Sequence, residues 1–251
     1  MMTNPRWQRL ARAAAGVAAG GLVALAPAQG AWVLQDDHEG VPRWSHSTIV
    51  VDPADSTNHA FVTSGASGHA ESLPLTTAVA DGTQATLFAR FYVATDSSPN
   101  LAFAIGTEAC TGYGTASFCV MPGAPPGLRG VGQAGETGGS DASWVRDAWV
   151  PFWITIDNAA HTFNVHVGAN PASPNQADPV AVFASDLAMR ALYLGDITRM
   201  AIEGWSSGPI HIDDIYLDTT GFNLTNPLIP EPATLALGLA GGALLMRRRR
   251  A

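Results

Sequence analysis

The chain contains 251 residues, of which 47% are hydrophobic and 14% are charged, a composition that supports a packed core and excludes a disordered chain. Its formal net charge is −8 at pH 7. When the arginines at the two ends and Glu231 are set aside, six arginines face twenty acidic residues between positions 29 and 228. This net charge near −14 excludes the region as a binding surface for nucleic acid or for anionic membranes.

The first 28 residues have the three parts of a secretory signal peptide. Three arginines form a charged start, an apolar run covers 13–26, and Ala26-Pro27-Ala28 supplies the small residues that precede a cleavage site. We expect export by the Sec machinery and cleavage by signal peptidase after Ala28, with Gly30 as the alternative position. A transmembrane anchor is the other interpretation of this run, but the run is short and rich in glycine and alanine.

Between positions 31 and 222, short apolar or alternating runs are separated by Gly, Pro, Asn and Asp, a pattern typical of strands and turns. Many short strands of this kind predict an all-β fold, a jelly roll or β-sandwich of two antiparallel sheets covering 29–222. The Gly- and Pro-rich stretch 122–143 is expected to be a long exposed loop. Strands are expected at 47–51, 59–64, 85–94, 101–107, 117–121, 149–157, 162–168, 200–205 and 210–219.

The two cysteines, Cys110 and Cys119, flank the segment TGYGTASF. In an exported protein, an isolated pair this close together predicts a disulfide that closes a hairpin loop. Such a bond would stabilise the fold by about 2–3 kcal/mol through loop closure. Two free thiols are the alternative, and the spacing is not that of a redox C-x-x-C motif.

Aromatic residues are the candidate ligand contacts, because the CH face of a sugar ring stacks on indole and phenol rings. The alternative is that each ring packs into the core, as most tryptophans in a β-sandwich do. On the 149–157 strand the alternation places Trp149 and Trp153 on the face opposite the aliphatic residues. The candidate sugar-binding residues are Tyr113, Trp144, Trp149, Trp153 and Trp205.

The sequence lacks the paired-carboxylate pattern of glucanases. The pattern E-x-D-x-x-E, which would aim two carboxylates into one cleft, is absent, and so are H-E-x-x-H and G-x-x-x-x-G-K. Asp213 and Asp214 are adjacent on a predicted strand, so their side chains are expected to point to opposite faces. We therefore predict no catalytic residues and a non-enzymatic protein, with a glycan-active enzyme as the alternative.

The C-terminus has its own organisation, with a linker at 223–229 and a tripartite tail at 230–251. The apolar run 233–246 would rise roughly 20 Å as a helix, less than the roughly 30 Å of a bilayer core. It is therefore a short, transient membrane segment, and the prolines before it keep the chain extended and open to a protease. The tail residues with assigned roles are Pro230, Glu231, Pro232, Arg247, Arg248, Arg249 and Arg250.

This order of Pro-Glu-Pro, apolar helix and arginine cluster resembles the PEP-CTERM sorting signal. The resemblance implies that an exosortase in the inner membrane of a Gram-negative bacterium recognises and processes the tail. It also implies that the mature protein is delivered to the cell surface or the extracellular matrix of an organism that makes exopolysaccharide.

The central region carries a second resemblance. DDHEG at 36–40, WVPFWITIDN at 149–158 and IHIDDIYLD at 210–218 resemble segments of concanavalin A-like lectins and glucanases and of related jelly-roll carbohydrate-binding modules. In those modules a structural calcium joins the first strand to the last, which implies Glu39, Asp213 and Asp214 as ligands here. The alternative is that these acids keep a secreted domain soluble and block pairing at sheet edges.

Together the two resemblances imply an exported, non-catalytic protein. It would bind polysaccharide, or act as a structural or adhesive component, in the exopolysaccharide layer. A glucanase or polysaccharide lyase of the same fold is the alternative function.

Overall fold

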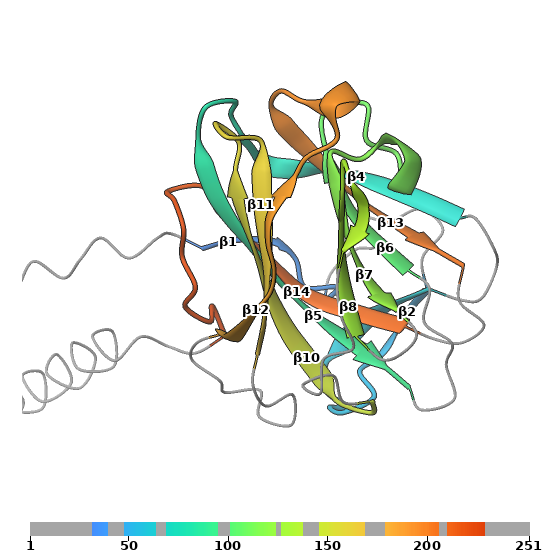
Figure 1. Ribbon diagram of the computed structural model, residues 1–251. Coiled ribbons are helices and arrows are strands. Elements are labelled where there is room, and N and C mark those ends of the chain that lie inside the picture. The colour runs from blue at the N-terminus through green and yellow to red at the C-terminus, as the bar shows by residue number, and fades with distance from the viewer. Residues whose placement is uncertain are drawn as a thin grey trace, which may run out of the picture.

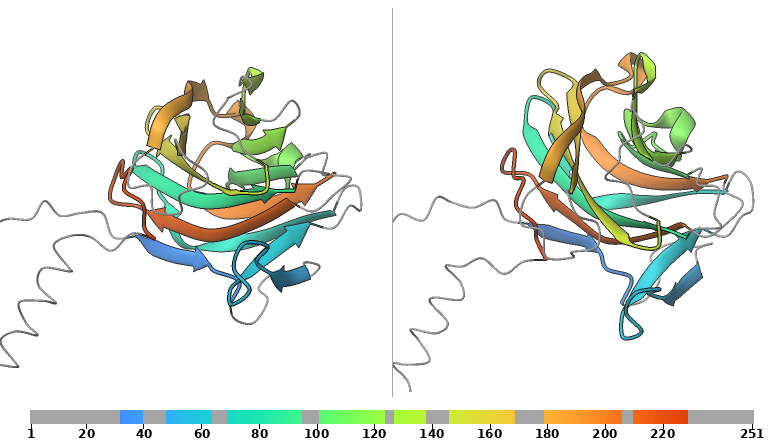
Figure 2. Two further views of the ribbon diagram at one scale, coloured as in Figure 1. Left: turned by 90° about the horizontal axis from the view of Figure 1, so that it is seen from below. Right: turned by 60° about the horizontal axis from the view of Figure 1, so that its bottom comes forward.

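The structure is a computed structural model that describes residues 32–39, 48–63, 69–94, 101–123, 127–137, 146–168, 179–205 and 210–228. It consists of two antiparallel β-sheets that face each other, with two short 3₁₀ helices in the connections (Figures 1 and 2). The described residues contain no α-helix. The predicted all-β class is therefore confirmed.

Sheet A carries the last strand of the domain at its centre. It has eight strands, in the spatial order β12 (Pro179–Ala188), β11 (Thr162–Gly168), β10 (Trp149–Asp157), β5 (Gln84–Val93), β14 (Ile210–Asp218), β3 (His59–Thr63) and β2 (Thr48–Val51), with β1 (Val33–Asp36) also paired to β14. β3 pairs with the first half of β14 and β1 with the second half. The chain between β2 and β3, and the residues that follow β1, therefore lie beside the middle of β14.

Sheet B has six strands, in the order β4 (His69–Val79), β13 (Ile197–Gly204), β6 (Leu101–Gly106), β7 (Phe118–Gly123), β8 (Gly127–Gly132) and β9 (Gly135–Thr137). The helix η1 (Tyr113–Thr115) lies between β6 and β7, and η2 (Ala191–Tyr193) lies between β12 and β13. Both helices therefore belong to connections that lead into sheet B.

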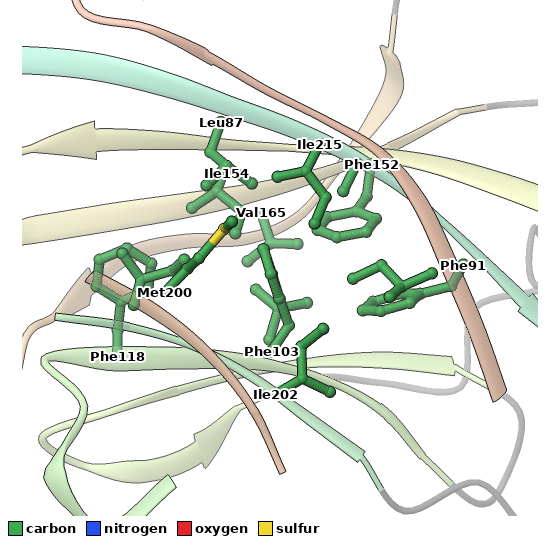
Figure 3. Close-up of a cluster of buried hydrophobic side chains, with 14 of the residues drawn as sticks. Leu87, Phe91, Phe103, Phe118, Phe152, Ile154, Val165, Met200, Ile202 and Ile215 are labelled. Carbon is green, nitrogen blue, oxygen red and sulfur yellow. The ribbon is translucent and has the colours of Figure 1, made fainter. Parts of the chain in front are cut away.

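The core fills the space between the inner faces of the two sheets (Figure 3). On β10 the alternate residues Val150, Phe152, Ile154 and Ile156 are fully buried and belong to this core, as the sequence pattern predicted. Phe152 stacks on Phe91 of β5 with 4.6 Å between ring centroids. Such aromatic contacts join strands within and across the sheets and add to the stabilisation from apolar burial.

All nine predicted strands are present. The structure also contains five strands that were not predicted from the sequence, namely β1, β4, β8, β9 and β12. The prediction that 122–143 is an irregular loop is wrong in part, because β8 and β9 lie within that stretch. Leu128 and Val131 of β8 are buried at 1% and 0% exposure. The glycines around them conceal the strand in the sequence, and pairing with β7 supplies the hydrogen bonds that stabilise it.

The two predicted terminal signals lie outside the described residues, both the signal peptide 1–28 and the sorting tail 230–251. Within the part of the chain that the structure describes, no helix is long and apolar enough to cross a membrane. The segment 223–228, predicted to be a linker, packs against sheet A, where Asn223 N–H donates to Thr86 Oγ1 at 2.8 Å.

Candidate functional site

The connection between β6 and β7 folds back over the outer face of sheet B. That face carries small side chains, Ala102 and Ala104 on β6 and Ala201 on β13, and all three are fully buried beneath the connection. Small residues leave room for a loop to lie close to the sheet. Tyr113 and Trp205 pack against this layer and remain half-buried.

The connection brings Tyr113 and Trp205 together, although they are far apart in the sequence. Their ring centroids lie 5.9 Å apart with an interplanar angle of 85°. The Arg190 guanidinium lies 4.6 Å from the centroid of the Tyr113 ring and donates to the Tyr113 carbonyl oxygen. Glu203 Oε2 accepts a hydrogen bond from Tyr113 N–H at 2.6 Å. We call these four residues the Tyr113 platform.

The platform is held by backbone contacts as well as by packing. Gly112 precedes η1 at a position where a Cβ atom would lie 2.5 Å from the carboxylate of Glu203. Only a glycine there permits the carboxylate to reach the backbone of Tyr113. The result is a partly exposed aromatic pair with one cation and one anion beside it, an arrangement suited to stacking and hydrogen bonding with a small polar ring.

The other candidate aromatic residues do not join this platform. Trp153 has no exposed surface, and its Nε1–H donates to the carbonyl oxygen of Thr225 at 2.9 Å. Trp149 is 6% exposed, and its Nε1–H donates to Asp52 Oδ1 at 2.9 Å. Both side chains lie on the outer face of sheet A, but the segments that carry Asp52 and Thr225 cover them. We therefore interpret them as structural residues and not as sugar-binding platforms. Trp144 lies outside the described residues.

The predicted disulfide is wrong for this structure, which contains Cys110 and Cys119 as free thiols. Both side chains are fully buried in the small-residue layer beneath the connection. Burial raises the pKa of Cys110 to about 11 and that of Cys119 to about 12, so both thiols are protonated at neutral pH. They act there as small apolar side chains.

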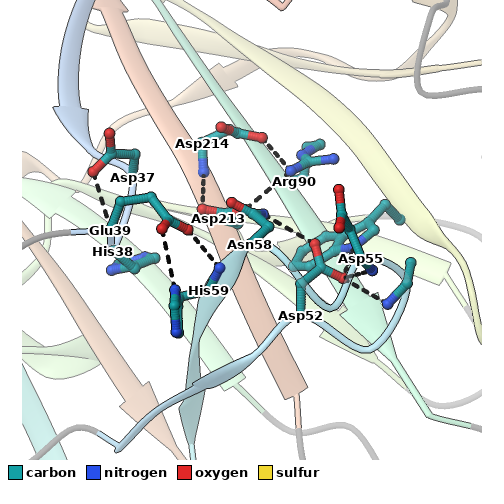
Figure 4. A network of polar contacts seen from close by, with 12 residues as sticks. Asp37, His38, Glu39, Asp52, Asp55, Asn58, His59, Arg90, Asp213 and Asp214 are labelled. Atoms are coloured by element: carbon teal, nitrogen blue, oxygen red, sulfur yellow. Dashed lines mark hydrogen bonds and ion pairs between the residues drawn. The ribbon is translucent and has the colours of Figure 1, made fainter.

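A second group of polar side chains lies on the outer face of sheet A, around the middle of β14 (Figure 4). Arg90 Nη2 lies 3.0 Å from Asp213 Oδ2 and also contacts Asp214 Oδ2. Asn58 Nδ2 donates to Asp213 Oδ2 at 2.9 Å. We call these four residues the Arg90 centre.

The expectation that Asp213 and Asp214 point to opposite faces is wrong. Asp214 has a φ of 53°, and the register between β14 and β5 shifts between Asp213 and Tyr216. This irregularity breaks the strict alternation of the strand. It turns both carboxylates toward Arg90, the cross-strand partner of Asp213.

The charges of the Arg90 centre do not balance, since one guanidinium faces two carboxylates. Burial first, and then the neighbouring Asp214 carboxylate, raise the pKa of Asp213 to about 7, while Arg90 acts in the opposite direction. Nearby, burial acts to raise the pKa of Asp52, but hydrogen bonds from Ala54 N–H, the Trp149 indole, the Asn58 amide and Asp55 N–H together lower it. Divergent carboxyl pKa values are typical of acid–base catalysts.

Burial separates these carboxyl groups from any substrate, however. Asp213 is 0% exposed and Asp52 is 4% exposed. A general acid has to come within hydrogen-bond distance of the bond that it protonates. In this conformation both groups reach only protein partners, so we interpret them as structural.

The three predicted calcium ligands do not converge. Glu39 accepts hydrogen bonds from the backbone N–H of His59 at 2.5 Å and lies 3.1 Å from its ring Nδ1. Asp213 and Asp214 both pair with Arg90. No group of three metal-ligating side chains occurs among the residues that the structure describes. Calcium takes six to eight oxygen ligands, so this set, with a guanidinium between two of its members, does not fit the ion.

Asp213→Asn should change how stability depends on pH. Because folding raises the pKa of Asp213 from 3.8 to about 7, the stability that this group contributes is full below about pH 4 and is lost as the pH rises toward 7. Between about pH 5 and about pH 8, the wild type should therefore lose stability relative to Asp213→Asn. Urea unfolding of both proteins at the two pH values measures the difference.

The histidines do not affect the difference in pH-dependent stability between the wild type and Asp213→Asn. Burial lowers the pKa values of His38, His166 and His211, which favours folding at higher pH. That contribution is present in both proteins and cancels in the difference. An identical pH dependence of wild type and variant would mean that Asp213 is ionised throughout the range.

No protein-family model and no curated protein matches the chain. Solved structures with a similar fold include peanut lectin, with a TM-score of 0.51 and 12% identity over 76% of this chain and 97% of the lectin. The lumenal domain of VIP36 bound to Ca²⁺ and Man3GlcNAc has a TM-score of 0.47 and 10% identity, over 80% and 91% of the two chains. The catalytic domain of a glycoside hydrolase family 131 protein from Coprinopsis cinerea has a TM-score of 0.41 and 11% identity, over 78% and 86%.

At this level of identity the likeness to peanut lectin shows the fold alone. It confirms that the central domain is a lectin-type jelly roll, as the strand pattern and the resemblance predicted. Fold does not determine function in such a domain, because function depends on the residues of the site.

Proposed function

We propose that this chain is an exported, non-catalytic protein that binds polysaccharide through the Tyr113 platform. The observation that carries the proposal is the half-buried pair of Tyr113 and Trp205, fixed 5.9 Å apart with Arg190 and Glu203 beside it. Two rings at this angle offer apolar surface in two directions, while the charged groups provide hydrogen bonds to hydroxyl groups.

The charge of the domain favours a neutral polymer over an acidic one. Six arginines face twenty acidic residues between positions 29 and 228. A polymer that carries many carboxylates or sulfates would be repelled by this field at low ionic strength. We therefore infer that the ligand is a neutral polysaccharide.

Delivery to the polymer is the role we assign to the two ends of the chain. The signal peptide 1–28 would direct export, and the Pro-Glu-Pro, apolar run and arginines of 230–251 would be processed by an exosortase. The mature domain would then reside at the cell surface or in the exopolysaccharide layer, where it binds polymer or acts as an adhesive or structural component.

An enzyme that cuts the same polymer is the second candidate. The motifs of glucanases are absent from the sequence, and the carboxyl pair with divergent pKa values is buried. Binding without shortening of the polymer would support the lectin-like function. A fall in polymer length, measured by size-exclusion chromatography after incubation with the protein, would support the enzyme instead.

Trp205→Ala should weaken binding to a neutral polysaccharide about tenfold or more, which corresponds to about 1.4 kcal/mol. Tyr113→Ala should have a similar effect, because it removes the other half of the pair. Affinity electrophoresis of the full-length protein in gels that contain β-glucan, mannan or alginate measures the retention. We expect retention by a neutral polymer and none by the acidic alginate.

Phe222→Ala is the matched control. Phe222 is an aromatic residue on the C-terminal segment with 50% of its surface exposed, and it is outside the platform. Its loss should leave retention unchanged. Equal retention of Trp205→Ala and wild type on every polymer that binds would refute the platform as the binding site.

A further inference from the structure

The two carboxylates of β14 meet at a single nitrogen atom. Arg90 Nη2 contacts Asp213 Oδ2 at 3.0 Å and also contacts Asp214 Oδ2. The side chains of Asp213, Asp214 and Arg90 are 1%, 15% and 12% exposed, so solvent screens these contacts only weakly. The guanidinium therefore has the position that a cation would take between two carboxylates.

Arg90 is held in this position from several sides. It pairs with Asp213 across the strands β5 and β14, which fixes its backbone. Its guanidinium carbon lies 4.7 Å from the ring centroid of Trp149, and that indole is anchored by its bond to Asp52. A guanidinium stacked on an aromatic face and paired with two carboxylates is well suited to a buried position.

A metal ion in the same place would meet two obstacles. The guanidinium would repel a divalent cation at a distance of a few ångströms in a poorly solvated environment. The carboxylate of Glu39, the third expected ligand, already accepts a hydrogen bond from the backbone N–H of His59. Its other oxygen lies 3.1 Å from Nδ1 of the His59 ring. The chain thus contains acidic residues at the expected positions but pairs those of β14 with its own cation.

We propose that Arg90 replaces a structural divalent cation in this domain, so that the fold is stable without metal. The proposal rests on the single guanidinium nitrogen that contacts both carboxylates. Removal of Arg90 should leave the buried carboxylate of Asp213 and the partly buried carboxylate of Asp214 facing a vacated space. Oxygen ligands of this kind suit calcium, so the variant should acquire a response to calcium that the wild type lacks.

The test measures the melting temperature of the full-length protein with EDTA, with calcium chloride, and with sodium chloride of the same ionic strength. The wild type should melt at the same temperature in all three. In EDTA, Arg90→Ala should melt several degrees below the wild type. Calcium should restore part of that loss in melting temperature, and sodium chloride should not. Arg199→Ala is the matched control, because Arg199 forms an ion pair at 2.8 Å with Glu108, which is 78% exposed. It should show no response to calcium.

Three results would overturn the proposal. The first is a wild-type protein that melts at a lower temperature in EDTA than in calcium. The second is a folded Arg90→Ala, shown by its far-UV circular dichroism, that calcium does not stabilise. If Arg90→Ala does not fold, Arg90→Lys keeps a positive charge and should fold without a response to calcium or EDTA. A calcium-dependent Arg90→Lys would also contradict the proposal, since a retained charge should be sufficient.

Discussion

Trp153→Ala is expected to lower the free energy of unfolding by about 3–5 kcal/mol, the typical cost of truncating a buried aromatic residue. Trp153 is fully buried, and its ring meets Phe88 edge to face with 5.1 Å between centroids. Its Nε1–H also donates to the Thr225 carbonyl oxygen. The substitution therefore opens a cavity and leaves a carbonyl without its donor. Urea unfolding, followed by tryptophan fluorescence and circular dichroism, measures the loss.

Trp153→Phe separates the two contributions. It keeps much of the ring volume and removes the hydrogen bond, which should cost about 1 kcal/mol for the bond, together with a smaller cavity term. Both variants should retain polysaccharide binding wherever they remain folded, because the platform is elsewhere. If Trp153→Ala kept wild-type stability and lost binding, Trp153 would be a ligand contact, and the burial of its ring would not describe the protein in solution.

Gly132→Ala is expected to cost about 2–3 kcal/mol, because there is no space for the added methyl group. A Cβ atom at Gly132 would collide with the carbonyl oxygen of Ala188 and would lie 3.2 Å from the ring of Phe163. Backbone atoms cannot turn aside as a flexible side chain can. The substitution should push β8 away from the end of β12, where Gln133 N–H donates to Ala188 O at 2.8 Å.

Gly114→Ala is the control for this prediction. Gly114 lies in η1, and a Cβ atom there would have no neighbour within 4 Å. Its effect on the unfolding free energy should stay within about 0.5 kcal/mol, as for most surface substitutions. Equal stability of Gly132→Ala and Gly114→Ala would show that the sheets are not closely packed at this edge.

The platform and the Arg90 centre lie on opposite outer faces of the sandwich. Ala102 and Ala104 beneath the platform alternate with the core residues of β6 in sheet B. Arg90 alternates with Ala89 and Phe91, which face the core from sheet A. A variant at one place should therefore leave the other intact. Loss of glycan binding and gain of a calcium response are separate results, so the failure of one proposal does not decide the other.

The sequence by itself determined the fold class and the inner face of the best-patterned strands. Alternation of apolar residues on β10 assigned Phe152 and Ile154 to the core, and both are fully buried there. Asp157 and Asn158, which favour turns, end the 149–157 run in the sequence, and the structure joins β10 and β11 there in an antiparallel pair. These features are local, because a period of two residues and a turn signal are both written in consecutive positions.

The sequence also contained a signal for the Arg90 centre. Arg90 is a charged residue in the apolar run ATLFARFYVA at 85–94, and a charge in a buried strand needs a partner. The pattern could not identify that partner, because the irregularity at Asp214 reverses the expected direction of a side chain. One residue in a left-handed conformation is enough to place two adjacent carboxylates on the same cation.

Only the tertiary structure decided which outward-facing aromatic residues remain accessible. Trp153 is covered because the segment around Thr225 lies across sheet A, where Trp32 and Trp153 both bond to it. Tyr113 is placed beside Trp205 and Glu203 by a connection that folds over a layer of alanines. Alternation along a strand tells which side a residue faces. It does not tell which distant segment covers that side, because this depends on contacts between residues far apart in the chain.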